Sequence, residues 1–133
     1  MQFSRKTDYA FILLDALKPT FSSGEFLALR AISERKSLPR AFLEKIASRL
    51  RKDKVVEARK GADGGYRLTR DPSSLTLKEV IDIFEEPPMM RCMRSPDPRK
   101  HCFLAQTCPT RLKWREVEAK VNKIFERATV AEL

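Results

Sequence analysis

The N-terminal stretch has apolar residues every three or four positions, a spacing that predicts an amphipathic helix. The apolar positions of this helix are Tyr9, Ile12, Leu13, Ala16 and Leu17. We expect it to begin at Arg5 and to end at Lys18-Pro19, because proline disfavours helical geometry in the residue before it. A loop over residues 21–24 and a short second helix ending near Lys36 should follow.

A third helix is predicted from Ser37, as its N-cap with Pro39 in the first turn, to about Asp53. Its apolar stripe consists of Leu43, Ile46, Ala47 and Leu50. The opposite side carries small, polar and basic residues, namely Ala41, Glu44, Lys45, Ser48 and Lys52. Such a face suits a helix that reads the major groove of DNA, and an ordinary solvated face is the alternative.

A basic hairpin is predicted next. Residues 55–59 alternate like a strand, residues 65–69 resemble its partner, and a glycine-punctuated turn joins them. Positive charge gathers at and near the tip through Arg59, Lys60 and Arg67. Two helices followed by a basic hairpin make the order of a winged helix-turn-helix, whose wing reaches the minor groove or the phosphates. A purely structural hairpin is the alternative.

The C-terminal half contains two further predicted helices and an irregular segment between them. A short helix opens with Thr76 as its cap and ends before Glu86-Pro87-Pro88. Residues 87–109 have no apolar period and carry five prolines, all three cysteines and the only histidine. Structureless loops longer than about 15 residues are uncommon in compact domains and are usually functional or disordered.

The last helix is predicted from Pro109 to about Thr129. Its apolar face consists of Trp114, Val117, Val121, Ile124, Phe125 and Ala128. A helix of about 20 residues is roughly 30 Å long, so this face extends beyond what one small domain can cover. We expect the same helix of a second copy to cover it, and packing within one subunit is the alternative.

These elements predict a mainly α fold with a small β-hairpin, a winged helix-turn-helix plus a long C-terminal dimerisation helix. Three units are expected. Residues 1–86 form a DNA-binding domain, residues 87–108 a cysteine-containing loop, and residues 109–133 the dimerisation helix and C-terminal tail. The 133 residues suit one domain with an appended element, and a hydrophobic content of 42% argues against disorder. No apolar run approaches the ~20 residues that span a bilayer, and the N-terminus lacks the features of a secretory signal. A cytoplasmic location without membrane contact, in which thiols stay reduced, is therefore expected.

The charge balance favours a polyanionic partner. The chain has 27 Lys and Arg against 18 Asp and Glu, which gives a formal net charge of +9. Such a surplus attracts nucleic acid through counterion release. Charge alone does not distinguish DNA from RNA, and acidic membrane surfaces and acidic proteins are further alternatives.

The three cysteines, Cys92, Cys102 and Cys108, are separated by nine and then five residues. Thiolates bind zinc and iron–sulfur clusters, but structural zinc usually takes close cysteine pairs, which are absent here. An iron–sulfur cluster, a redox-active thiol and an inert loop all remain compatible with this spacing. Nearby basic residues would lower the thiol pKa values and offset the charge of an anionic cluster; they are Arg91, Arg94, Arg99 and Lys100. His101 has no evident acidic partner, so an enzyme is the least favoured class.

The order and spacing of these segments resemble the IscR/NsrR family of bacterial iron–sulfur transcription regulators. The likeness covers nearly the whole chain. It rests on residues 4–10 (SRKTDYA), 42–46 (FLEKI) followed by Leu50-Arg51, 59–61 and 64–68 of the hairpin, the three-cysteine loop, and 129–133 (TVAEL).

The resemblance implies a homodimer crossed by its long C-terminal helices. Each subunit would hold a cluster, 4Fe–4S favoured over 2Fe–2S, that responds to nitric oxide, redox state or iron supply. Cys92, Cys102 and Cys108 correspond to the family's cluster-binding cysteines, but the first gap is longer than the usual five to seven residues. Arg111 stands where one branch has a histidine ligand, and guanidinium has no free lone pair.

The fourth ligand is therefore open. A second branch of the family resembles nitric-oxide sensors. In that branch the fourth ligand is an aspartate from the first helix of the partner subunit. Asp8 stands at the matching position here, with a solvated first-turn acid as the alternative reading. His101 is the next candidate, and water or a small thiol are the others.

The leading hypothesis is thus a cluster-controlled repressor that binds a palindromic operator in double-stranded DNA. We expect Arg40, Glu44, Lys45 and Ser48 to approach base edges, and Arg59, Lys60 and Arg67 to contact the minor groove or phosphates. A cluster-free regulator of the same fold with a thiol switch, and a basic RNA-associated protein, are the alternatives.

Overall fold

The computed structural model describes residues 2–86, 89–93 and 96–133. The long first helix lies at the centre of the winged-helix body, which comprises residues 2–86. Helix α1 (Arg5–Ser23) buries one face of mostly apolar side chains, namely Thr7, Ala10, Leu13, Leu14, Leu17 and Thr20. The helix runs through Pro19, so the predicted end at that residue and the predicted loop over 21–24 are wrong. It ends instead at Gly24, whose φ of 72° is a left-handed conformation that glycine adopts readily.

A local bond and a tertiary bond of Thr20 explain why the helix continues past Pro19. The Thr20 hydroxyl donates to the Leu17 carbonyl oxygen at 2.6 Å and accepts the Leu68 N–H at 3.0 Å. The proline removes one N–H donor from the last turns, and burial of Thr20 against strand β2 (Gly65–Leu68) offsets that loss.

Helices α2 (Leu29–Lys36) and α3 (Arg40–Lys52) form the helix-turn-helix. The predicted N-cap of α3 is wrong by two residues. Ser37 has a φ of 53° and its N–H bonds the Ser33 carbonyl, so it ends α2, and Pro39 precedes α3 in extended conformation. The Ser33 hydroxyl donates to the Leu38 carbonyl at 2.6 Å, which fixes the turn between the two helices. The predicted apolar stripe of α3 is confirmed, since Leu43, Ile46, Ala47 and Leu50 are all buried.

The predicted hairpin is confirmed. Strand β1 (Val56–Arg59) pairs antiparallel with β2, and Glu57 lies directly opposite Arg67. Val56 and Leu68 face the core, while Glu57, Arg59 and Arg67 lie on the other face of the hairpin. A short bridge between Leu27 and Tyr66 adds the segment before α2 to the edge of this sheet.

Helix α4 (Leu77–Phe84) follows, with Thr76 and Glu79 forming the capping box that satisfies its first turn. The chain then leaves the body through two short 3₁₀ turns, η1 (Arg91–Met93) and η2 (Pro98–Lys100), and returns along α5 (Arg111–Arg127). Helix α5 begins at Arg111, two residues later than predicted, with Thr110 as its N-cap.

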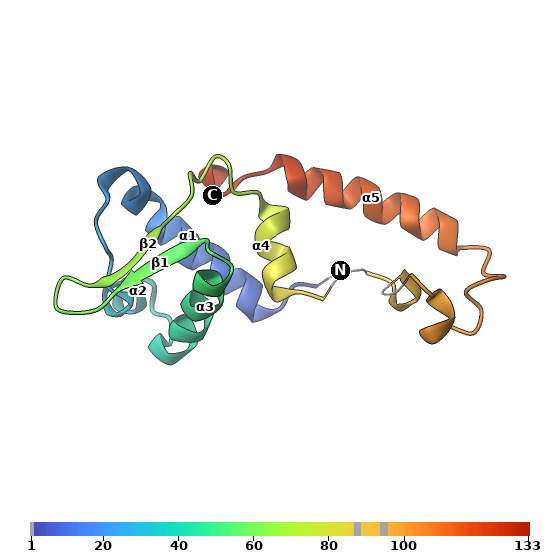
Figure 1. Ribbon diagram of the computed structural model, residues 1–133, viewed down its shortest axis with the longest axis horizontal. Helices are drawn as coiled ribbons and strands as arrows, with labels where there is room; N and C mark the ends of the chain where they lie inside the picture. Colours follow the sequence, from blue (N-terminus) through green and yellow to red (C-terminus); the bar gives the residue numbers. More distant parts are fainter. Residues whose placement is uncertain (1, 87–88, 94–95) are drawn as a thin grey trace.

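The C-terminal residues attach α5 to the body. The Leu77 N–H bonds the Ala128 carbonyl and the Val130 N–H bonds the Leu75 carbonyl, both at 2.9 Å. Val130, in η3 (Val130–Glu132), is fully buried beside α1. Figure 1 shows α5 extending away from the winged-helix body, with the cysteine-containing segment below its far end.

The fold is therefore mainly helical with a two-stranded hairpin, as predicted. Within the described residues, no helix is long and apolar enough to cross a membrane.

Candidate nucleic-acid interface and cysteine segment

The outward face of α3 is the first candidate contact surface. Because its apolar stripe is buried, the four predicted base-reading residues are exposed; these are Arg40, Glu44, Lys45 and Ser48. Arg40 donates to Glu44 through a 3.0 Å Nε–Oε1 contact, and both side chains are more than half exposed. An exposed pair of this kind stabilises a helix by only about 0.3–0.5 kcal/mol, so either partner is readily available to another ligand.

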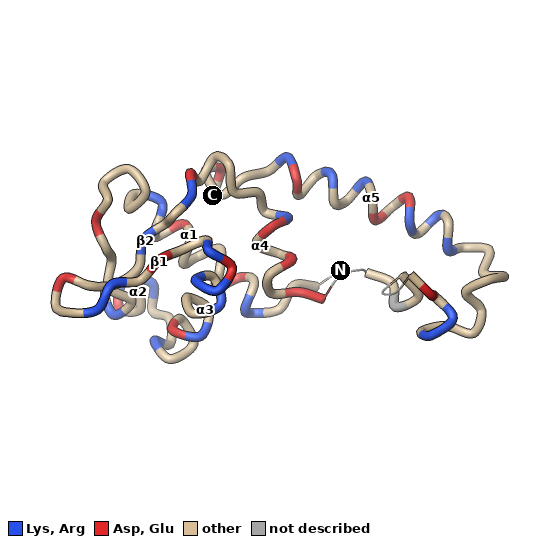
Figure 2. The backbone as a smooth tube through the Cα atoms, viewed as in Figure 1, with Lys and Arg blue, Asp and Glu red and all other residues tan. Residues whose placement is uncertain are grey.

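Lys45 and Ser48 are placed differently from that pair. Neither the Lys45 ammonium nor the Ser48 hydroxyl makes a hydrogen bond or ion pair with any residue that the structure describes. Figure 2 shows lysines and arginines along α3 and the hairpin, and also along α5. The structure thus places the four residues on one helix face, while the DNA contacts assigned to them remain predictions.

The hairpin carries the other three predicted contact residues, and they are not equivalent. Lys60 is exposed at the tip, and no hydrogen bond or ion pair joins its ammonium to the described part of the chain. The Arg59 guanidinium donates to the Asp63 carbonyl oxygen at 2.8 Å. Arg67 instead donates to the Glu57 carboxylate and to the Gly24 carbonyl oxygen.

Phe26 is a residue of this surface that sequence reasoning missed. The guanidinium carbons of Arg59 and Arg67 lie 4.3 and 4.7 Å from the centroid of its ring. Phe26 lies in a segment without regular periodicity, so the apolar pattern gave no reason to select it. An aromatic residue just before the second helix, together with arginines on both strands, was the available signal.

The three cysteines are free and half-buried. Cys92 lies in η1, Cys102 follows η2, and Cys108 precedes α5. Among the described residues, no group of three or more His, Cys, Asp or Glu side chains is gathered closely enough to hold a metal ion. The structure therefore places the cysteines on one segment but does not bring their sulfur atoms together. Arg94, one of the predicted neighbouring charges, lies outside the described residues.

The donor set of this segment nevertheless fits an iron–sulfur cluster chemically. Hydrogen bonds from the Thr110 hydroxyl and N–H, with a smaller contribution from Arg111, lower the pKa of the Cys108 thiol and favour the ligand-competent thiolate. The Arg111 Nε is buried and has no hydrogen-bond partner among the described residues. A buried guanidinium N–H on the residue three positions after Cys108 is suited to offset the charge of an anionic sulfur-containing group.

The two candidates for a fourth ligand lie apart from each other in the chain. Asp8 is exposed in the first turn of α1, and its backbone N–H bonds the Ser4 carbonyl at 3.3 Å. His101 is exposed at the end of η2. Neither belongs to a gathered ligand group in the described chain, and both stay predictions.

A carboxylate connects the start of α1 to the start of the cysteine segment. Glu85 Oε1 accepts the Ser4 N–H at 2.7 Å and the Ser4 hydroxyl at 2.8 Å, and also accepts the Thr7 hydroxyl. Burial raises the pKa of the Glu85 carboxyl, but the bonds from Thr7 and Ser4 outweigh it, so this pKa is lowered overall. Sequence reasoning did not select Glu85, because its partners are about 80 residues away.

Helix α5 contacts its own body incompletely. None of its residues is buried, and Leu112 and Ile124 are 75% and 65% exposed. A cavity of about 410 Å³ separates part of α5 from α4 and the N-terminal residues. Its lining includes Phe3, Ile81, Trp114, Val121 and Phe125.

Comparison with known proteins identifies the family. Residues 3–133 match the Rrf2 family, described as iron-dependent transcriptional regulators. The chain is 32% identical over 106 residues to the HTH-type transcriptional regulator IscR of Sodalis glossinidius, an alignment that covers 79% of this chain. It spans 62% of the length of that relative.

Solved structures agree on the fold. A putative transcriptional regulator from Listeria innocua superposes with a TM-score of 0.79 at 23% identity, covering 98% of this chain and 84% of that one. CymR, the global cysteine regulator of B. subtilis, superposes with a TM-score of 0.74 at 22% identity, covering 98% and 94%. The matched family consists of transcriptional regulators rather than enzymes. The chain belongs to the Rrf2 family.

Proposed function

We propose that the chain is a transcriptional repressor that binds double-stranded DNA with α3 in the major groove. The observation that supports this most strongly is the division of α3 into a buried apolar face and an exposed polar face. Arg40, Glu44, Lys45 and Ser48 carry the donors and acceptors that read base edges. The net charge of +9 supplies the attraction to phosphates that any such contact needs.

The hairpin acts as the wing in this proposal. Lys60 at the tip has no partner within the described chain, so its ammonium is available to a phosphate or to the minor groove. Arg59 lies at the base of the same turn and is exposed. Arg67 was predicted from the sequence as a third contact of the wing.

Residues 109–133 form the dimerisation unit of the proposed regulator. The exposed apolar side chains of α5 support this, because a helix of this composition normally buries one face. A second copy related by a twofold axis would cover that face. Two recognition helices related by the same axis would then read a palindromic operator.

Residues 87–108 form the effector segment, and we propose that it holds an iron–sulfur cluster, 4Fe–4S rather than 2Fe–2S. Cys92, Cys102 and Cys108 would be the thiolate ligands, with Asp8 of the partner subunit or His101 as the fourth. When bound, the cluster would supply an iron centre that reacts with nitric oxide or oxidants and depends on iron supply. Arg111 would offset the negative charge of the site through its unpaired Nε–H.

A second candidate is a cluster-free regulator of the same fold that is switched by thiol oxidation. The lowered pKa of the Cys108 thiol supports it, since the thiolate is the form that oxidants attack. The fold-level likeness to CymR, which is named as a cysteine regulator, makes this candidate worth testing beside the first.

The experiment is anaerobic purification followed by absorption spectra and iron and sulfide counts. The cluster proposal predicts visible absorption and stoichiometric iron and sulfide in the wild-type protein, both lost in Cys102→Ser. Asp8→Ala should change the spectrum or the rate of reaction with nitric oxide, whereas Glu25→Ala, another exposed acid, should not. Colourless protein that binds DNA only when reduced, or only when oxidised, would favour the thiol switch. Preference for bulk RNA over a selected duplex would contradict DNA binding.

A further inference from the structure

The bonding of Arg67 differs from that expected of a DNA contact. Its Nε donates to the Glu57 carboxylate directly across the hairpin, and its Nη1 donates to the Gly24 carbonyl oxygen at 2.8 Å. Its guanidinium carbon lies 4.7 Å from the centre of the Phe26 ring. The side chain is only 35% exposed. The charge, two donor positions and one face of this guanidinium are thus already engaged within the subunit.

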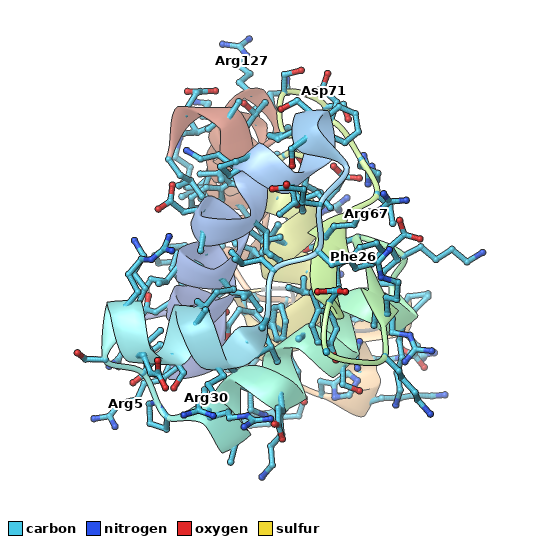
Figure 3. All side chains as sticks on the ribbon, turned by 90° about the vertical axis from the view of Figure 1, so that its left-hand side faces the viewer. Arg5, Phe26, Arg30, Arg67, Asp71 and Arg127 are labelled. Carbon is cyan, nitrogen blue, oxygen red and sulfur yellow. The ribbon has the colours of Figure 1, made fainter. Side chains whose placement is uncertain are left out.

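These contacts belong to a seam, defined as the bonds that join β2 to the last turn of α1 and to the segment between α1 and α2. Leu27 and Tyr66 exchange two backbone hydrogen bonds of 2.9 Å, and the Leu68 N–H bonds the Thr20 hydroxyl at 3.0 Å. At Gly65 the approach is so close that an added Cβ would lie 2.3 Å from the Leu27 carbonyl oxygen. Arg67 lies in the middle of this seam, and Figure 3 shows it beside Phe26.

Arg59 shares the aromatic ring but has a different charge environment. Its guanidinium carbon lies 4.3 Å from the Phe26 centroid, and its Nη2 donates a hydrogen bond to a neutral acceptor, the Asp63 carbonyl oxygen. Two positive charges thus lie over the Phe26 ring. Glu57 balances the charge of Arg67, whereas the hydrogen bond of Arg59 goes to an uncharged acceptor. A cation held against an aromatic ring loses rotamer freedom before it meets a ligand, which lowers the entropic cost of binding.

We propose that Arg67 is a positioning residue of the wing and contributes no contact charge to DNA. Together with Phe26 it fixes the hairpin against the helix-turn-helix and directs Arg59 toward the phosphates or the minor groove. This inference rests on the proposed DNA-binding function and revises the role that the sequence predicted for Arg67. It also assigns Phe26 a role in DNA binding without any contact to DNA.

The test compares variants that keep charge with one that removes it, using one duplex selected by the wild-type protein and a series of salt concentrations. Arg67→Lys keeps the charge but loses the planar, forked geometry, and Phe26→Leu removes the ring without changing any charge. Each should weaken binding about two- to fivefold with an unchanged salt slope. Lys60→Ala should lower the slope by about one unit, since one phosphate contact is lost. Phe26→Tyr should restore wild-type affinity.

The double variant sharpens the result. If Arg67 and Phe26 act as one unit, Phe26→Leu in the Arg67→Lys background should cost less than it does alone. Wild-type affinity and slope in Arg67→Lys would overturn the inference, because a lysine can replace a phosphate contact but not this anchor.

Hydrogen exchange separates failure of this inference from failure of the proposed function. The Leu27 and Tyr66 amides should exchange faster in Arg67→Lys and Phe26→Leu than in Lys60→Ala. A wild-type protein that bound no duplex would contradict the proposed function, and this exchange pattern would still decide whether Arg67 and Phe26 anchor the hairpin. Unchanged exchange in both variants would overturn the anchor.

Discussion

The winged-helix body and the segment that follows it differ in how many of their apolar side chains are buried within one subunit. In the body, large side chains such as Leu14 and Leu43 are fully buried in one continuous core. Beyond residue 86, the only buried apolar residues that the structure describes are Ala105 and Val130, and Val130 belongs to the tail packed on the body. Phe103, by contrast, is 91% exposed.

The body therefore has a core of its own, whereas the part of the described chain beyond residue 86 leaves most of its apolar side chains partly or fully exposed. In the proposed regulator, a second subunit would cover the exposed apolar side chains of α5, and a cluster would draw the three thiols together. Such an arrangement suits a regulator, because a ligand changes a conformational equilibrium most where the free protein is least constrained.

The largest effect of a single substitution is expected on dimerisation, at the exposed apolar side chains of α5. Ile124→Asp would place an unpaired charge in the proposed dimer interface and should cost about 3–5 kcal/mol of dimerisation free energy. Sedimentation velocity should show monomers at micromolar concentration and a folded body by circular dichroism. Lys123→Glu, a charge change at a neighbouring exposed position, is the control and should remain dimeric. A dimeric Ile124→Asp protein would contradict the role of α5.

The next effect concerns the apolar side chains themselves. Leu14→Ala removes a fully buried side chain and should destabilise the body by about 2–5 kcal/mol in urea denaturation. Phe103→Ala removes a larger side chain from the cysteine segment and should change stability by less than about 0.5 kcal/mol, because that side chain is exposed. Equal losses for the two variants would show that the segment packs as a part of the core.

Within the body, α3 and the wing should lose DNA affinity in different ways. Lys45→Ala should cost about 1–3 kcal/mol at particular base pairs of the selected duplex and little at others. Lys60→Ala should instead weaken all sequences alike. Fluorescence anisotropy with single-base variants of the duplex measures both patterns. A uniform loss in Lys45→Ala would remove that residue from the base-reading set.

The smallest effect is expected at Glu85, where the body meets the cysteine segment. A carboxyl with a lowered pKa stabilises the fold above its unfolded-state pKa, and this contribution is lost as pH falls through the folded-state pKa. Glu85→Gln should cost about 1 kcal/mol at neutral pH, and its stability should fall less than that of wild type on acidification below the ordinary glutamate range. Parallel urea titrations at pH 7 and pH 3 compare the two proteins. An identical pH dependence would assign no role to the carboxylate.

Most of the body could be predicted from sequence because its signals are local. The apolar stripe of α3 and the Thr76 cap depend on residues within a few positions of each other, and the structure confirms both. The end of α1 could not be predicted in this way, because Thr20 is held by the distant strand residue Leu68. Because α1 continues past Pro19, Gly24 lies close enough for its carbonyl oxygen to accept a bond from Arg67. A helix that ended at Pro19, as predicted, gave no reason to expect the contacts of the seam.

The sequence indicated which residues belong to the candidate sites but not how their side chains are arranged in space. Spacing identified Cys92, Cys102 and Cys108, but it carries no information on where three sulfur atoms of an aperiodic segment come to lie. Charge identified Arg67 but did not show that Glu57 neutralises it across the hairpin. Pairing of this kind depends on strand register, which hydrophobic alternation fixes only after the partner strand is known.

The central claim is that the cysteine segment controls DNA binding by the body. Its most direct test is the affinity of anaerobically purified, reduced protein for a duplex selected by that protein, measured at one salt concentration before and after chelation of iron. The account predicts at least a tenfold change in affinity, about 1.4 kcal/mol, and no change on chelation in Cys102→Ser. Equal affinity of the wild-type protein before and after iron removal would contradict it.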